Sequence, residues 1–223
     1  MNSILTLGLI GVALIAGVAT PDEVNIRKDS AASTGIAVLD TNTDTIHSTV
    51  EEQSRHMEAL SQMPGFRSAA VLNSRDGQHV ILYTQWNSLE SLQAATQTND
   101  GKSLKPFGVV YLAIPAGGDA LPLSKASSRA ILINVISTDP QRIDALYGFW
   151  VRGAESYWLH QPDVSGTALH RAADNSTLIN IASWTSADAW QNAAQHAAGN
   201  FAGAHGVGTS DPKIYDIAAI KLR

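Results

Sequence analysis

The sequence contains an internal repeat, and this repeat limits the chain to folds that two similar units can build together. When the sequence is laid over itself at a constant offset of 98 residues, residues of the same chemistry coincide without a gap. The coinciding pairs are Pro64 with Pro162, Asp76 with Asp174, Trp86 with Trp184, Ser88 with Ser186, and Glu90 with Asp188. A period of this length corresponds to one small domain. The sequence therefore predicts two tandem copies of a single unit.

Both copies predict the same order of strands and helices. Each begins with a β-branched run and continues with a segment that has the apolar spacing of a helix. A pair of strands around a turn follows, then a second helix that starts at Ser88 or Ser186, then a last strand. The predicted strands are 35–41, 66–74, 79–86 and 107–114 in the first copy and 130–138, 164–172, 177–184 and 214–222 in the second. The order β-α-β-β-α-β predicts an α+β fold made of two ferredoxin-like units.

The repeat and the composition also predict the domain boundaries. We expect residues 34–115 to form the first domain and residues 129–223 to form the second, which is the one expected to be active. Residues 116–128 contain adjacent glycines, a proline and several serines, which is typical of a connector. Residues 1–33 are expected to form an apolar arm followed by a polar linker.

The arm contains an uninterrupted apolar run from Ile4 to Ala19. The run is short for a membrane span, which needs about 20 residues, but it has the size of a signal-peptide core. No basic residue precedes it. A secretory signal, a membrane anchor and an arm packed on the body all stay open. We expect a cytoplasmic protein, with export or anchoring through this run as the alternative.

Charge and composition exclude several function classes. The formal net charge is −5, which provides no basic surface for a nucleic-acid backbone. The chain has no cysteine, so thiol nucleophiles, thiolate zinc sites and iron–sulfur clusters are excluded. No histidine pair has metal-ligand spacing, and no glycine-rich phosphate loop is present. We therefore expect no metal site and no nucleic-acid partner.

The two copies differ at strand positions where the polar side chains of an active site would be expected. The second copy has Asn134 and Asn180 where the first copy has Ala37 and Leu82. Alternation along the strand puts Asn180 and Trp184 on one face, about 13 Å apart. A buried amide without a partner costs on the order of 1–3 kcal/mol. Each asparagine is therefore expected to have either an internal hydrogen bond or a ligand.

Several motifs together resemble the antibiotic biosynthesis monooxygenase family. They are the Pro64-Gly65-Phe66 lead into a strand, the turn aspartates, the strand ends Gln85-Trp86 and Ser183-Trp184, and the Ser-x-acid helix starts. The resemblance covers about residues 34 to 223. It implies an α+β barrel that two units close by pairing their sheets, usually as a homodimer. A tandem chain can build that barrel alone, and a homodimer of the whole chain stays open.

The resemblance also implies a reaction and a site. Asn180 and Trp184 fit the Asn-x-x-x-Trp spacing of the metal-free aromatic monooxygenases of this family. It implies that Asn180 holds an oxygen of a small aromatic substrate and that Trp184 positions the ring. Trp190 stands where those enzymes commonly have a tyrosine, so that phenol is absent here. A purely structural role for Asn180 and Trp184 is the alternative.

Further candidates complete the predicted site. His170 is a candidate base that could take a phenolic proton near neutral pH, or else a surface histidine. Asn134, Trp190 and Trp158 are expected to line a substrate pocket. The predicted function is the oxidation of an anthrone, naphthol or quinol to a quinone by O2 without a cofactor.

Other activities of the fold leave alternatives open. One is a ring-cleaving oxygenase that depends on reduced flavin, and another is a non-catalytic binding or stress-related protein. Haem degradation is a weaker alternative, because the histidine that the family places ten residues after a tryptophan is replaced by Ala194 and Asn200.

Overall fold

Eight antiparallel strands form a closed barrel in the computed structural model, in the order β10-β3-β4-β2-β5-β8-β9-β7. The structure describes residues 22–28, 32–127, 129–197 and 206–223. The barrel strands are β2 (Ser33–Asp40), β3 (Phe66–Ser74), β4 (His79–Trp86), β5 (Lys105–Ala113), β7 (Ala130–Ser137), β8 (Val164–Ala172), β9 (Thr177–Trp184) and β10 (Thr209–Leu222). Both predicted hairpins have the bounds that the sequence indicated.

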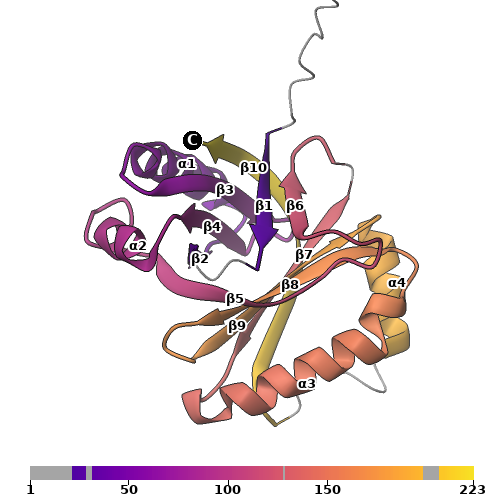
Figure 1. Ribbon diagram of the computed structural model, residues 1–223. Coiled ribbons are helices and arrows are strands. Elements are labelled where there is room, and N and C mark those ends of the chain that lie inside the picture. The colour runs from indigo at the N-terminus through magenta and orange to yellow at the C-terminus, as the bar shows by residue number, and fades with distance from the viewer. Residues whose placement is uncertain (1–21, 29–31, 128, 198–205) are drawn as a thin grey trace, which may run out of the picture.

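Four α-helices cover the outside of the barrel, two on each half of the chain (Figure 1). They are α1 (Ile46–Ser61), α2 (Leu89–Thr96), α3 (Ile143–Ser156) and α4 (Ala187–Ala197). Short 3₁₀ turns, Pro140–Arg142 and Trp158–His160, flank α3. Ser88 and Ser186 accept hydrogen bonds from backbone N–H groups of the helices they precede, as their positions predicted. Each half thus has the order β-α-β-β-α-β.

The barrel closes because the last strand of each half also pairs with a strand of the other half. In the first half the strand order is β5-β2-β4-β3, and β5 also pairs with β8 of the second half. In the second half β10 pairs with its own β7 and with β3 of the first half. One chain therefore supplies every strand pairing of the α+β barrel. We call residues 32–114 the first half and residues 129–223 the second half.

A small second sheet lies where the sequence predicted connectors. β1 (Glu23–Arg27) pairs with β6 (Ala120–Ser124), and the ribbon packs against β3, β8 and β10. Val24, Ile26, Leu121 and Leu123 are buried in it and join the apolar cluster of the barrel interior. Apolar and polar residues alternate along both strands, which is typical of a strand with one buried face. Because each stretch is short and lies close to Gly, Pro and Ser residues, the sequence favoured a connector at both places.

Strand alternation divides the core into an inner and an outer part. Residues such as Ile36, Tyr83 and Ile181 face the barrel interior. On the outer face of the first half, one continuous cluster joins the sheet to α1 and α2. On the outer face of the second half, two separate clusters lie under α3 and α4. The gap between these two clusters is the feature that positions the site.

Among the helices in the described ranges, none combines the length and the apolar character that crossing a bilayer requires. The apolar run from Ile4 to Ala19 lies outside the described residues.

Candidate functional site

A cavity of about 270 Å³ lies between the outer face of the second-half sheet and the helices α3 and α4. Strands β7, β8, β9 and β10 form its floor and the two helices form its walls. Its volume is close to the lower end of the roughly 300–1,000 Å³ of small-molecule sites. The cavity therefore fits a small ligand, and most of its lining is apolar.

The strands bring both predicted asparagines to this cavity. Asn134 on β7 and Asn180 on β9 are directly opposite each other across the sheet, and both line the cavity. Ala182 and Trp184 follow Asn180 on the same face of β9, as the alternation predicted. The site residues named from the sequence thus come together here, with the exception of His170.

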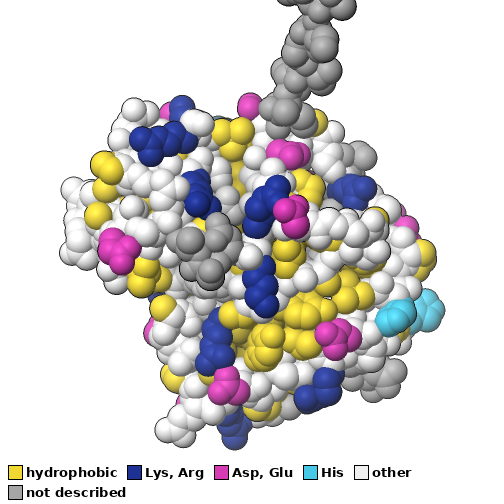
Figure 2. Space-filling model, in the orientation of Figure 1, with side chains coloured by type: hydrophobic (Ala, Val, Ile, Leu, Met, Phe, Trp, Pro, Cys, Tyr) yellow, Lys and Arg dark blue, Asp and Glu magenta, His cyan; other side chains and the backbone are white. Residues whose placement is uncertain are grey.

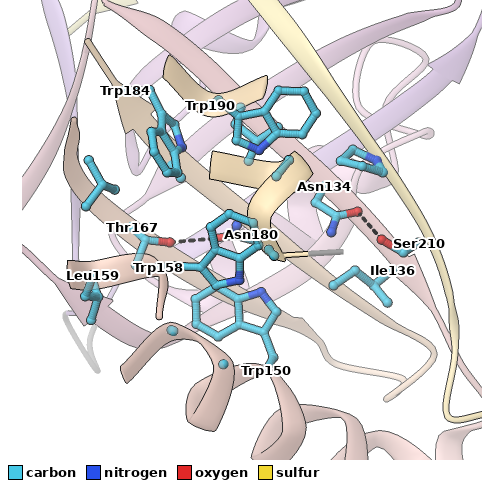
Figure 3. Close-up of a pocket in the computed structure, with 18 of the residues that line it drawn as sticks. Asn134, Ile136, Trp150, Trp158, Leu159, Thr167, Asn180, Trp184, Trp190 and Ser210 are labelled. Atoms are coloured by element: carbon cyan, nitrogen blue, oxygen red, sulfur yellow. Dashed lines mark hydrogen bonds between the residues drawn. The ribbon is translucent and has the colours of Figure 1, made fainter. Parts of the chain in front are cut away.

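Each asparagine is oriented by a neighbouring hydroxyl group (Figure 3). The Thr167 hydroxyl donates to Asn180 Oδ1 over 2.6 Å, and the Ser210 hydroxyl donates to Asn134 Oδ1 over 3.0 Å. Because the oxygens are occupied, the Nδ2 groups are the free ends of the two amides. Neither Nδ2 group has a hydrogen bond to any described residue.

Trp184 provides a third donor without a partner. Its side chain is 1% exposed, and its Nε1–H finds no hydrogen-bond acceptor among the described residues. In Figure 3 the indole nitrogen is on the side of the ring that faces the other labelled side chains. An orphaned buried donor costs on the order of 1–3 kcal/mol. Trp184 lines the cavity, so a ligand oxygen that reached this donor would remove the cost.

Indole rings form much of the cavity wall. Trp150 comes from α3, Trp158 from the turn after it, and Trp190 from α4. Trp158 packs edge-to-face on Trp184, with ring centroids 6.2 Å apart. These rings surround the amide and indole donors in Figure 3. The arrangement suits a flat aromatic ligand, because aromatic rings pack favourably in offset or edge-to-face contact.

The described residues that line the cavity include no Asp, Glu, His, Lys, Arg or Tyr. The polar groups of the lining are amides, hydroxyls and indole N–H groups. Among the described residues, no cluster of His, Cys, Asp and Glu has the arrangement of a metal site. The site can therefore position, hydrogen-bond and desolvate a ligand through neutral groups.

His170 does not belong to the cavity. It lies on β8, but alternation turns it to the barrel interior while Thr167 and Leu169 face the helices. Its ring is 0% exposed, with Nε2 3.2 Å from the Tyr83 hydroxyl and Nδ1 3.3 Å from the Ile179 carbonyl oxygen. Burial lowers the pKa of His170 to about 4. The structure corrects both readings of the sequence, because His170 is neither a pocket base nor a surface residue.

Sequence reasoning missed the two hydroxyl groups that orient the amides. Thr167 stands where the first half has Ala69, so a comparison of the two copies could have revealed it. Ser210 comes from the first residues of β10, which begins at Thr209 rather than at the predicted residue 214. No pattern in the sequence indicated that β10 would extend so far.

The fold and the cavity define a class of protein, an α+β barrel with ferredoxin-like order and a cavity under the helices of its second half. Residues 36–103 match the model of the antibiotic biosynthesis monooxygenase family. The likeness to this family therefore lies in the first half. The cavity lies in the second half, outside the matched residues.

Solved structures with this fold include three that cover most of the chain. An anthrone oxidase-like protein is 16% identical, with a TM-score of 0.73 over 89% of this chain and 96% of that chain. A proposed monooxygenase from Fusobacterium nucleatum is 8% identical, with a TM-score of 0.58 over 86% and 95%. A staphylococcal regulator of pathogenesis is 10% identical, with a TM-score of 0.50 over 82% and 98%.

These identities are low, so the likeness extends to the fold and not to the activity. The search of curated proteins found no match.

Proposed function

We propose that the cavity is the active site of a monooxygenase that oxidises an electron-rich aromatic compound, such as an anthrone, with O2 and without a cofactor. The observation that carries the proposal is the set of unpaired donors in an aromatic wall: Trp184 Nε1 and the Nδ2 groups of Asn180 and Asn134. The likeness to an anthrone oxidase-like protein supports this choice of substrate.

The proposed reaction converts a ring methylene and O2 into a ring ketone and water. Loss of one proton to solvent water, because the described lining of the cavity has no base, gives a carbanion whose charge is spread onto a ring oxygen. This anion transfers one electron to O2, and the resulting radical and superoxide combine to a peroxide. The peroxide takes up a proton and eliminates water, which leaves the quinone carbonyl. One oxygen atom of O2 enters the product and the other enters water.

The protein residues would act by binding and by excluding water. Asn180 would donate a hydrogen bond to the oxygen that gains negative charge, and this donor needs no reorganisation because Thr167 already fixes the amide. Trp184 would position the ring and donate through its indole N–H. Trp158 and Trp190 would hold the ring system. The apolar wall would protect the radical pair from water. Asn134 would hold a second oxygen of the substrate.

The proposal assigns different tasks to two tandem units. The second unit, residues 129–223, would hold the substrate, and the first unit, residues 34–115, would complete the barrel. The filled outer core of the first half supports this division, because the positions of Asn134 and Asn180 are occupied there by Ala37 and Leu82.

The test is aerobic oxidation of an anthrone, followed by oxygen uptake and quinone absorbance. We expect Asn180→Leu to lower the turnover rate about 100-fold, which is typical for the loss of an oxyanion donor. Asn192→Leu, which changes an exposed amide on α4, is the matched control and should leave the rate unchanged. Equal rates for wild type and Asn180→Leu would remove Asn180 from the mechanism.

Two further results would replace the proposal. Turnover that begins only when reduced flavin is added would make the protein a flavin-dependent oxygenase. Tight binding of the anthrone without quinone formation under either condition would make it a binding protein.

A further inference from the structure

We propose that the cavity binds its ligand in the ionised form, as the phenolate or enolate of a flat hydroxylated aromatic ring system, and that Thr167 and Ser210 are positioning residues that set this preference. The inference rests on the proposed function, because it places the substrate in the same cavity. It goes further by naming the ionisation state that is recognised and the residues that select it.

The hydrogen-bonding groups of the cavity favour a ligand that accepts hydrogen bonds over one that donates them. Trp184 Nε1, Asn180 Nδ2 and Asn134 Nδ2 are donors without a partner among the described residues. Each of the two amide oxygens already accepts a hydrogen bond from a hydroxyl group, which leaves only its second lone pair for a ligand. A neutral phenol would bring one more donor to this set. A phenolate or enolate oxygen accepts only, so it can take a hydrogen bond from any one of these donors without leaving a proton of its own unpaired.

The donors are prepared for an anion before it arrives. Trp184 is 1% exposed and Asn180 is 8% exposed, so both are almost fully removed from water in the folded protein. A ligand oxygen therefore replaces no strong existing bond at Trp184. Hydrogen bonds to an ionised acceptor are about twice as strong as those between neutral groups. An anionic ligand therefore binds more tightly than a neutral ligand, because its hydrogen bonds to these donors are stronger.

The hydroxyl groups decide which end of each amide points into the cavity. The Thr167 hydroxyl donates to Asn180 Oδ1 over 2.6 Å, and Ser210 does the same for Asn134 over 3.0 Å. In Figure 3 the Asn134 nitrogen points away from Ser210. Without the hydroxyl, an amide can turn over and present its oxygen, which repels an anion. The first half has Ala69 at the position of Thr167 and lacks this device.

Charged groups around the cavity do not line it. The titratable or charged side chains on α3, α4, β10 and the turn after α3 lie outside the lining; they include Arg152, Glu155, His160, Asp188, His196 and Asp211. Neutral donors would therefore stabilise the anion. His205 lies outside the described residues and is included in the test for this reason.

The experiment measures the ionisation of a bound ligand that cannot be oxidised at the ring methylene. The probe is 2-hydroxyanthraquinone, whose phenol has no neighbouring carbonyl to donate to and whose visible absorption shifts when the phenol ionises. A pH titration is recorded for the free probe and for the probe with excess protein. We expect the pKa of the bound probe to be lower by at least about one unit, which means that the anion binds about tenfold more tightly than the phenol.

Variants identify the groups responsible for the shift. Thr167→Val keeps the shape of the side chain and removes the hydroxyl, and we expect it to remove at least half of the pKa shift. Asn134→Ala combined with Asn180→Leu installs the residues of the first half and should abolish the shift. Asn192→Leu is the matched control, with an unchanged shift. Circular dichroism and urea unfolding establish that each variant is folded.

Several results would overturn the inference. They are failure of the probe to bind, a bound pKa equal to or above that of the free probe, and a shift that survives the double variant. A shift that disappears in His205→Ala would also overturn it, because a cation would then be responsible. A lowered pKa in a protein that forms no quinone from an anthrone would support this inference while refuting the oxygenase.

Discussion

The two halves of the barrel place the same elements in the same register, yet one encloses a cavity and the other is filled. In the first half, Ala37 lies opposite Leu82 on neighbouring strands. In the second half, Asn134 lies opposite Asn180 at the equivalent places. The fold supplies the space between sheet and helices, and a few side chains decide whether that space is core or pocket.

The helices contribute to the same difference. On α1 the buried side chains under the first half include Met57 and Leu60, which reach into the outer core. On α3 the buried positions include Gly153 and Ala154, which line the cavity. Small residues on one helix therefore leave the room that large residues on the other helix occupy. The comparison shows that the pocket results from the small side chains on α3 as well as from the two amides on the sheet.

The hydrogen bonds of the two buried tryptophans differ in a related way. Trp86 Nε1 donates to Thr84 Oγ1 over 2.9 Å, and Thr84 itself donates to the Gly35 carbonyl. Trp184 has Ala182 at the position of Thr84, and no acceptor for its indole N–H is found in the described part of the chain. The first half thus satisfies internally a group that the described residues of the second half leave without an acceptor.

The largest expected effect comes from moving the amide into the filled half. Leu82→Asn removes a fully buried leucine and buries an amide beside Ala69, where no hydroxyl can orient it. Lost burial and an unpaired amide together should lower the free energy of unfolding by about 4 kcal/mol. Urea unfolding measures the loss. A loss below about 1 kcal/mol would mean that the first half also has room for a polar group.

A slightly smaller effect is expected from His170, whose equivalent in the first half is Leu72. The folded protein keeps His170 neutral down to a pKa of about 4, whereas the unfolded chain binds a proton near pH 6.5. Between pH 6.5 and 4 the unfolded state therefore takes up a proton that the folded state does not. The free energy of unfolding should fall by about 3 kcal/mol across this window and stay level above it.

Urea unfolding at several pH values between 7.5 and 4 measures this dependence. His170→Leu, which installs the residue of the first half, should remove that part of the slope. The same slope in wild type and variant would assign the acid sensitivity to other groups.

A moderate effect is expected when the first half is made to resemble the second at its tryptophan. Thr84→Ala leaves Trp86 Nε1 buried without an acceptor and also removes the hydrogen bond to Gly35. We expect the free energy of unfolding to fall by about 2 kcal/mol. Thr84→Ser, which keeps the hydroxyl, is the control and should recover most of the loss. Equal losses for both variants would attribute the effect to the methyl group.

The smallest effect is expected from the reverse change. Ala182→Thr gives Trp184 the acceptor that Trp86 has, so the free energy of unfolding should rise by about 1 kcal/mol. Binding of 2-hydroxyanthraquinone should weaken at the same time, because the donor is then occupied. Ala182→Val has the same shape without the hydroxyl and should bring no stabilisation. A stabilised variant with unchanged ligand affinity would show that Trp184 does not contact the ligand.

Much of the fold could be predicted because its signals are local. The hairpins over Phe66–Trp86 and Val164–Trp184 follow from strand-forming runs on both sides of turn residues, and Asn175 adopts the positive φ of 60° that such a turn requires. Ser88 and Ser186 start helices for reasons contained in a few residues. The strands β1 and β6 could not be predicted in this way, because each depends on a partner about 100 residues away in the chain.

The sequence by itself determined the repeated order of elements, the shared face of Asn180 and Trp184, and the exchange of Ala37 and Leu82 for two amides, because alternation and the repeat are properties of neighbouring residues. Only the tertiary structure decided that His170 faces the barrel interior, that Thr167 and Ser210 orient the amides, and that a cavity remains above them. These outcomes depend on which side chains of β7, β8, β10 and α3 come into contact in the folded protein. No local sequence pattern encodes the packing between such distant segments.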